Sequence, residues 1–96
     1  MKQYLIHAWD GQDENAMDRR MQVREQHLLG AKKLKANGNF ILGGAMLNDE
    51  GKMIVSTLIL QFEGEADFEA WKNAEIYLLK KVWERIEIYP FKVAEV

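Results

Sequence analysis

The order of secondary-structure signals along the chain predicts one α+β domain that spans residues 1–96. Four segments are rich in β-forming residues, and two others carry apolar residues at helical spacing. They follow one another as strand, helix, strand, strand, helix, strand, which is the split βαβ or ferredoxin-like order. This order predicts a four-stranded antiparallel sheet with both helices on one face.

The first predicted strand covers residues 4–9, and both of its faces are largely apolar. On this strand we interpret His7 as a core histidine that is hydrogen-bonded to backbone. The turn over residues 10–15 leads into the first helix, where Asp13 or Asn15 can cap the free N–H groups.

The first predicted helix, over residues 17–34, carries polar side chains in the middle of its apolar stripe. At about 100° per residue, the apolar side chains fall within one arc that should pack on the core. These side chains are Ala16, Met17, Met21, Val23, Leu28, Ala31 and Leu34. Arg20, Arg24 and His27 lie near the centre of the same arc. Either the arginine stems snorkel to solvent around a satisfied core histidine, or the helix carries a buried polar site. Gly38 is well placed to end this helix in the left-handed conformation.

A pair of glycines, Gly43 and Gly44, interrupts the second predicted strand, which begins at Phe40. Such a pair marks a bulge or a close approach to the backbone. We expect one of them to adopt a backbone conformation forbidden to other residues, or to make room for a ligand. A hairpin loop over residues 48–51 and a long strand over residues 53–62 follow.

The C-terminal part predicts a helix over residues 66–74, a further helical turn within residues 75–82, and a last strand over residues 85–91. Asn73 is expected to interrupt the helix. Pro90 cannot donate to a neighbouring strand, so the last strand is expected at an edge of the sheet or near its own end.

The sheet face without helices is predicted to be apolar, with either Leu5, Trp9, Val55 and Ile59 on it or the equivalent set one register over. An apolar face of this size should not remain in water. The same face of a second copy is its simplest cover, so we predict a homodimer.

Composition excludes several classes of function. The net charge is −2 and no basic run stands out, so we predict no nucleic-acid partner. The chain has no cysteine, which removes disulfides and thiolate nucleophiles. No apolar run reaches the roughly 20 residues of a membrane span, and no signal-peptide pattern is present. We therefore expect a cytoplasmic protein without a membrane partner. We predict no cofactor, and no metal site because His7, His27 and Glu75 lack a ligand spacing motif.

Short motifs are spread along nearly the whole chain. They are Tyr4-Leu5-Ile6, Asp10, Arg20, Val23-Arg24, His27-Leu28, Gly44-Ala45-Met46, Trp71, Ala74-Glu75, Tyr77 and Pro90-Phe91-Lys92. In these motifs the chain resembles the YCII-related domain family. The resemblance implies a ferredoxin-like fold that dimerises sheet to sheet into an α/β barrel. Muconolactone isomerases and a ring-dechlorinating lyase of aromatic catabolism are similar in fold.

The resemblance also implies an acid–base pair. In this family a histidine on the first helix and an aspartate after the second helix are proposed to form it. His27 matches the histidine, and Glu75 stands where aspartate, often followed by proline, is usual. Glu75 could instead pair with Arg24 or Lys72. We expect Arg24, Gly44 and Met46 to contact a small ligand, either anionic or aromatic.

Two functions follow from these residues. The first is a small-molecule enzyme of the lyase or isomerase type, in which His27 acts as acid or base. The second is a non-catalytic dimeric module that binds a small ligand or regulates. A concave pocket at His27, with Glu75 within hydrogen-bond reach, would favour the first.

Overall fold

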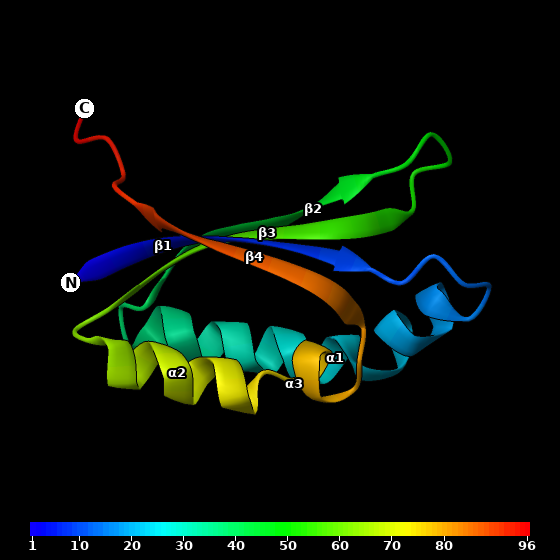
Figure 1. Ribbon diagram of the computed structural model, residues 1–96, viewed down its shortest axis with the longest axis horizontal. Coiled ribbons are helices and arrows are strands. Elements are labelled where there is room, and N and C mark those ends of the chain that lie inside the picture. Colours follow the sequence, from blue (N-terminus) through cyan, green and yellow to red (C-terminus); the bar gives the residue numbers. More distant parts are fainter.

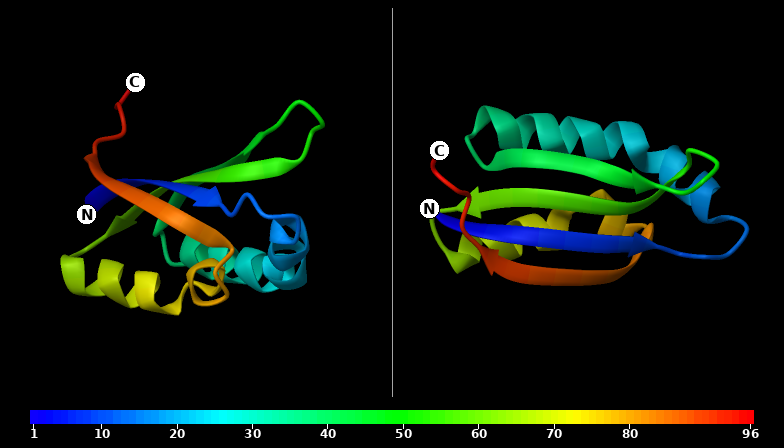
Figure 2. Two further views of the ribbon diagram at one scale, coloured as in Figure 1. Left: turned by 45° about the vertical axis from the view of Figure 1, so that its right-hand side comes forward. Right: turned by 90° about the horizontal axis from the view of Figure 1, so that it is seen from above.

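The computed structural model describes all 96 residues of the chain, Met1–Val96. Its elements are β1 (Lys2–Asp10), α1 (Ala16–Ala36), β2 (Phe40–Leu47), β3 (Met53–Phe62), α2 (Glu65–Ala74), α3 (Ile76–Leu79) and β4 (Trp83–Phe91). The strands form one antiparallel sheet in the order β2-β3-β1-β4. The right-hand view of Figure 2 shows them side by side in this order. The predicted ferredoxin-like fold is confirmed, and β4, which contains Pro90, is an edge strand as expected.

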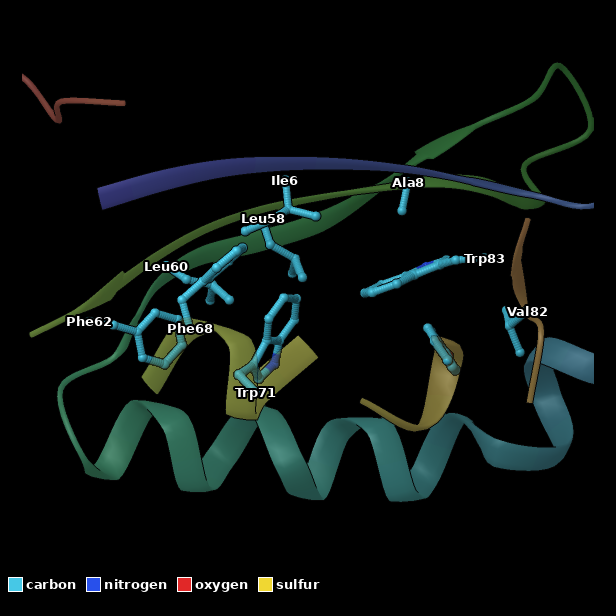
Figure 3. Packing of buried hydrophobic residues seen from close by; sticks show 10 residues of the cluster. Ile6, Ala8, Leu58, Leu60, Phe62, Phe68, Trp71, Val82 and Trp83 are labelled. Atoms are coloured by element: carbon cyan, nitrogen blue, oxygen red, sulfur yellow. The ribbon is translucent and has the colours of Figure 1, made fainter. Parts of the chain in front are cut away.

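All the helices lie on one side of the sheet, and the other side is open (Figure 1). Between the two layers sits a core of ten buried side chains. They are Ile6, Ala8, Leu58, Leu60, Phe62, Phe68, Trp71, Tyr77, Val82 and Trp83. Figure 3 shows Phe68 and Trp71 rising from α2 toward Leu58 and Leu60 of β3. Strand alternation explains this core, because every second residue of β1 and β3 points toward the helices.

Fewer apolar side chains of helix α1 pack on the core than the sequence predicts. Its only buried residue is Arg20, while Met21 is 54% exposed and Leu28 is 40% exposed. Val23 and Leu34 are the residues of α1 that pack against the core cluster. The prediction of an apolar helix face was therefore wrong for Met21 and Leu28. Polar side chains occupy the centre of the arc, so the apolar residues at its margins remain in solvent.

The sequence predicts the C-terminal end of α1 correctly but not the capping of its N-terminal end. Asn15 is the N-cap residue, but neither it nor Asp13 caps the helix with its side chain. Asp13 instead binds the guanidinium of Arg19 at 2.6 and 2.8 Å. At the other end Gly38 has φ +79°, the predicted left-handed conformation.

The irregularities in β2 lie on either side of the paired glycines. The β2–β3 register shifts between Phe40 and Leu42 and again between Met46 and Leu47, and neither Gly43 nor Gly44 has a positive φ. The expectation of a special backbone conformation was therefore wrong. Gly43 is required by packing instead, because a Cβ there would lie 2.6 Å from Phe40 Cζ.

The open sheet face carries the predicted apolar residues together with one histidine. Leu5, Trp9 and Ile59 are half-buried on it. His7 was expected in the core, but strand alternation places it on this face. There its Nδ1 lies 2.9 Å from Thr57 Oγ1, so it bonds a side chain rather than backbone. No helix of the structure has the length and apolar character needed to cross a membrane.

Candidate active site

His27 lies on α1, where it faces the sheet and is enclosed by aromatic rings. Its ring stacks on Tyr77 with centroids 3.9 Å apart and an interplanar angle of 5°. Trp83 meets the same ring edge-on at 5.6 Å. The His27 side chain is 12% exposed, so these contacts fix the orientation of the imidazole and leave part of it accessible.

Glu75 is brought to His27 by the break between α2 and α3. The helix continues past Asn73 to Ala74, and Glu75 then has extended angles, φ −67° and ψ 120°. Glu75 is the N-cap of α3, and its Oε1 accepts the backbone N–H of Tyr77 at 3.3 Å. The same oxygen lies 2.5 Å from His27 Nδ1. The contact between His27 and Glu75 that we predicted is therefore present, and the cap fixes the carboxylate without a proline.

The other partners considered for Glu75 are not used. Lys72 pairs with Glu69 at 3.3 Å, and Arg24 makes no ion pair. Because an ionised carboxylate can only accept hydrogen bonds, His27 Nδ1 donates and Nε2 is left free. A histidine held in this way can exchange a proton with a bound molecule through Nε2.

A second buried polar cluster lies next to this pair. Arg20 donates to both carboxylate oxygens of Asp10, at 3.0 and 3.1 Å, and to Ser56 Oγ at 3.1 and 3.3 Å. Trp83 Nε1 also donates to Ser56 Oγ, at 3.1 Å. The side chains of Arg20 and Asp10 are only 4% and 6% exposed. Burial raises the pKa of the Asp10 carboxyl, and the charge of Arg20 opposes that shift. Helix α1 therefore carries a buried polar site, and Arg20 does not snorkel.

A cleft of about 190 Å³ opens beside His27, between α1, β2 and β3. Its walls are Arg20, Arg24, His27, Leu28, Ala31, Phe40, Gly43, Gly44, Ala45, Met53, Ser56, Leu58 and Tyr77. Of the expected ligand contacts, Arg24 and Gly44 line this cleft. Met46 does not, because it pairs with Val55 on the open sheet face. No group of three potential metal-ligating side chains comes together anywhere in the structure.

Two cleft residues had no assigned role from the sequence. Tyr77 was identified only as part of the family motif, and Ser56 was not singled out. The position of Arg20 near the centre of an apolar arc was the available sequence signal for this cluster. A single tyrosine on a four-residue helix gave no comparable signal.

The sequence and fold comparisons identify the family and agree with the fold. Residues 3–92 match the YCII-related domain. The chain belongs to the YCII-related domain family. Protein YciI of Escherichia coli O6:H1 is 33% identical over 95 residues, which cover 93% of this chain and 95% of that protein. An uncharacterised protein of Haemophilus influenzae is 32% identical over the same shares.

Solved structures share the fold of this YCII-related chain. TftG from Burkholderia phenoliruptrix AC1100, a 5-chloro-2-hydroxyhydroquinone dehydrochlorinase, has a TM-score of 0.80 at 20% identity. That match covers 96% of this chain and 95% of TftG. A dimeric ferredoxin-like protein of unknown function from Jannaschia sp. CCS1 has a TM-score of 0.60 at 15% identity, over 97% and 100% of the two chains.

Proposed function

We propose that this protein is a small-molecule enzyme of the lyase or isomerase type, in which His27 transfers a proton and Glu75 orients its ring. The observation that carries the proposal is the 2.5 Å contact between His27 Nδ1 and Glu75 Oε1 at the wall of a cleft. A positioned imidazole of this kind typically accelerates a reaction by about 10²–10⁴.

The proposed chemistry uses the free Nε2 of His27. This nitrogen takes a proton from the bound molecule, and the carboxylate of Glu75 stabilises the imidazolium that forms. In an isomerisation the proton returns at a second atom of the same molecule. In an elimination a leaving group departs as the proton is removed. Arg24, which has no ion pair, would balance the negative charge that develops on the molecule.

The compounds named with TftG provide the first test. That protein is described as acting on 5-chloro-2-hydroxyhydroquinone and was solved with 2,5-dihydroxybenzoquinone. We expect chloride release when the present protein is incubated with 5-chloro-2-hydroxyhydroquinone, followed with a chloride electrode. His27→Asn keeps a donor for Glu75 but lacks Nε2, so its rate should fall by about 10²–10⁴. Equal rates for the variant and the wild type would contradict the proposed role.

The alternative function, a non-catalytic ligand-binding or regulatory module, predicts a different outcome of the same experiment. Such a module would bind 2,5-dihydroxybenzoquinone without releasing chloride from the chlorinated compound. The buried acid–base pair in a cleft favours the enzyme, because binding alone does not need an imidazole oriented by a carboxylate.

We also propose that the protein acts as a homodimer joined through the open sheet face. Four side chains on that face are well exposed in the single chain. They are Leu42 at 60%, Met46 at 51%, Tyr89 at 46% and Phe91 at 39%. The similar structure from Jannaschia sp. CCS1 is described as dimeric, which supports this assembly.

A further inference from the structure

Two residues that line the cleft beside His27 each carry a buried hydrogen-bond donor without a partner. These donors are the hydroxyl of Tyr77 and the Nε–H of Arg20. Both residues line the cleft, and they are only 1% and 4% exposed. Buried polar groups in native proteins are nearly always hydrogen-bonded. Unpartnered donors at the wall of a cleft therefore point to an acceptor on a bound molecule.

The other polar groups of the cleft also donate or carry positive charge. Arg24 lines the cleft and makes no ion pair. The oxygen of Ser56 already accepts from Arg20 and Trp83, both at 3.1 Å. The cleft thus has donors in excess and no free carboxylate. A ligand that pairs with these donors must have acceptor oxygens. Negative charge on those oxygens strengthens the hydrogen bonds.

The hydroxyl of Tyr77 keeps its proton in this buried environment. Burial raises the pKa of its hydroxyl above the ordinary value of 10.0, although Arg20 and Arg24 oppose the shift. At neutral pH the hydroxyl is therefore a donor and not a phenolate. The guanidinium of Arg20 lies 5.2 Å from the Tyr77 ring centroid, so the positive charge of Arg20 lies close to the Tyr77 ring.

The volume of the cleft limits the size of the ligand. The cleft of about 190 Å³ is close to the cavity of about 150 Å³ that holds one benzene ring.

We propose that the Tyr77 hydroxyl, together with Arg20 and Arg24, binds an enolate or phenolate oxygen of a small, single-ring substrate. This inference rests on the proposed function, because that oxygen would be conjugated to the position where His27 moves the proton. Tyr77 is then a substrate-binding residue, and it selects acidic oxygens over neutral ones.

The test is a calorimetric titration with 2,5-dihydroxybenzoquinone, whose acidic hydroxyls are ionised at neutral pH. Tyr77→Phe removes only the hydroxyl and keeps the stack on His27. We expect it to weaken binding by about 10- to 100-fold, as for loss of a hydrogen bond to a charged acceptor. Hydroquinone, a similar ring with neutral hydroxyls, should bind weakly to wild type and Tyr77→Phe alike.

Tyr4→Phe is the matched control. The Tyr4 hydroxyl is also buried without a partner, but Tyr4 lines a different hollow, between the chain termini. Its removal should leave the binding of 2,5-dihydroxybenzoquinone unchanged. Unaltered melting temperatures for both variants would show that each one folds.

Three outcomes would overturn the inference. They are failure of the wild type to bind 2,5-dihydroxybenzoquinone at millimolar concentration, equal affinity in Tyr77→Phe, and equal loss of affinity in Tyr4→Phe. Failure of the proposed function looks different. In that case 2,5-dihydroxybenzoquinone binds and loses affinity in Tyr77→Phe, but no chloride is released from 5-chloro-2-hydroxyhydroquinone.

Discussion

The carboxylate oxygen of Glu75 that lies 2.5 Å from His27 Nδ1 is also the acceptor that caps α3. One atom therefore links the start of a short helix to the proposed acid–base pair. Because Glu75 Oε1 has both roles, substitutions that keep the cap and substitutions that remove it should have different effects.

Glu75→Gln should lower activity without unfolding the site. The amide oxygen can still accept the Tyr77 N–H, but the negative charge that stabilises the His27 imidazolium is lost. We expect chloride release from 5-chloro-2-hydroxyhydroquinone to fall by about tenfold or more, as on loss of a positioned catalytic group. Glu75→Ala should in addition lower the free energy of unfolding by about 0.5–2 kcal/mol, because the cap is lost. Equal activity of Glu75→Gln and wild type would argue against the pair.

The open sheet face should control assembly. A homodimer through this face is expected to bury more than about 1,200 Å² in total. Ile59→Lys places a charge at the middle of the face and should give a monomer in sedimentation velocity at tens of micromolar. Leu79→Lys is the control, because Leu79 is 58% exposed on α3, away from this face. A wild-type monomer at that concentration, or a dimer that persists in Ile59→Lys, would rule out this interface.

The two adjacent glycines of β2 should respond differently to alanine. A Cβ at Gly43 would lie 2.6 Å from Phe40 Cζ and 2.8 Å from Leu58 Cδ2, whereas one at Gly44 meets no atom within 4 Å. Gly43→Ala should therefore lower the free energy of unfolding by about 1–3 kcal/mol, as overpacking does. Gly44→Ala should be nearly neutral in urea unfolding. Equal stability of the two variants would show that Phe40 moves aside freely.

The ion pair between Asp13 and Arg19 should make stability depend on pH in the acid range. Its hydrogen bonds to Arg19 lower the pKa of Asp13 from 3.8 to about 2. A carboxyl with a lowered folded-state pKa stabilises the fold above pH 3.8 and loses that contribution as pH falls through about 2. The stability difference between wild type and Asp13→Asn in urea should therefore shrink between pH 4 and pH 2. Asp49→Asn, in the exposed hairpin, should show no such change, and a constant difference for Asp13→Asn would contradict the assignment.

Much of the fold could be predicted from local signals. The alternation of strand residues placed Leu5, Trp9, Val55 and Ile59 on one face, and Gly38 marked the end of α1. These features depend on periodicity and on backbone angles that few residues tolerate. Sequence periodicity placed Arg20 near the centre of the packed arc of α1. It could not show that the guanidinium is buried rather than extended to solvent, because apolar patterning assumes that burial follows hydrophobicity.

The site could be predicted in part from helical periodicity and in part from the family motif. The pattern of the first helix marked Arg20, Arg24 and His27 as polar side chains on an apolar arc. Glu75 came from the family resemblance, and the sequence did not decide whether it pairs with His27, Arg24 or Lys72. Which partner Glu75 contacts depends on the break after Ala74, because this break sets the direction of the Glu75 side chain in the tertiary structure. The sequence also did not show on which side of the sheet Met46 lies, because that side is set by its pairing with Val55 after the irregularity at Ile41.

The nitrogen-15 spectrum of the histidine rings tests the proposed pair most directly, because the chain contains only two histidines. His7→Gln assigns the remaining ring to His27. We predict that Nδ1 carries the proton, that Glu75→Gln alters its signal, and that 2,5-dihydroxybenzoquinone shifts Nε2. A ring protonated on Nε2 alone, or one that responds to neither change, would contradict proton transfer by His27.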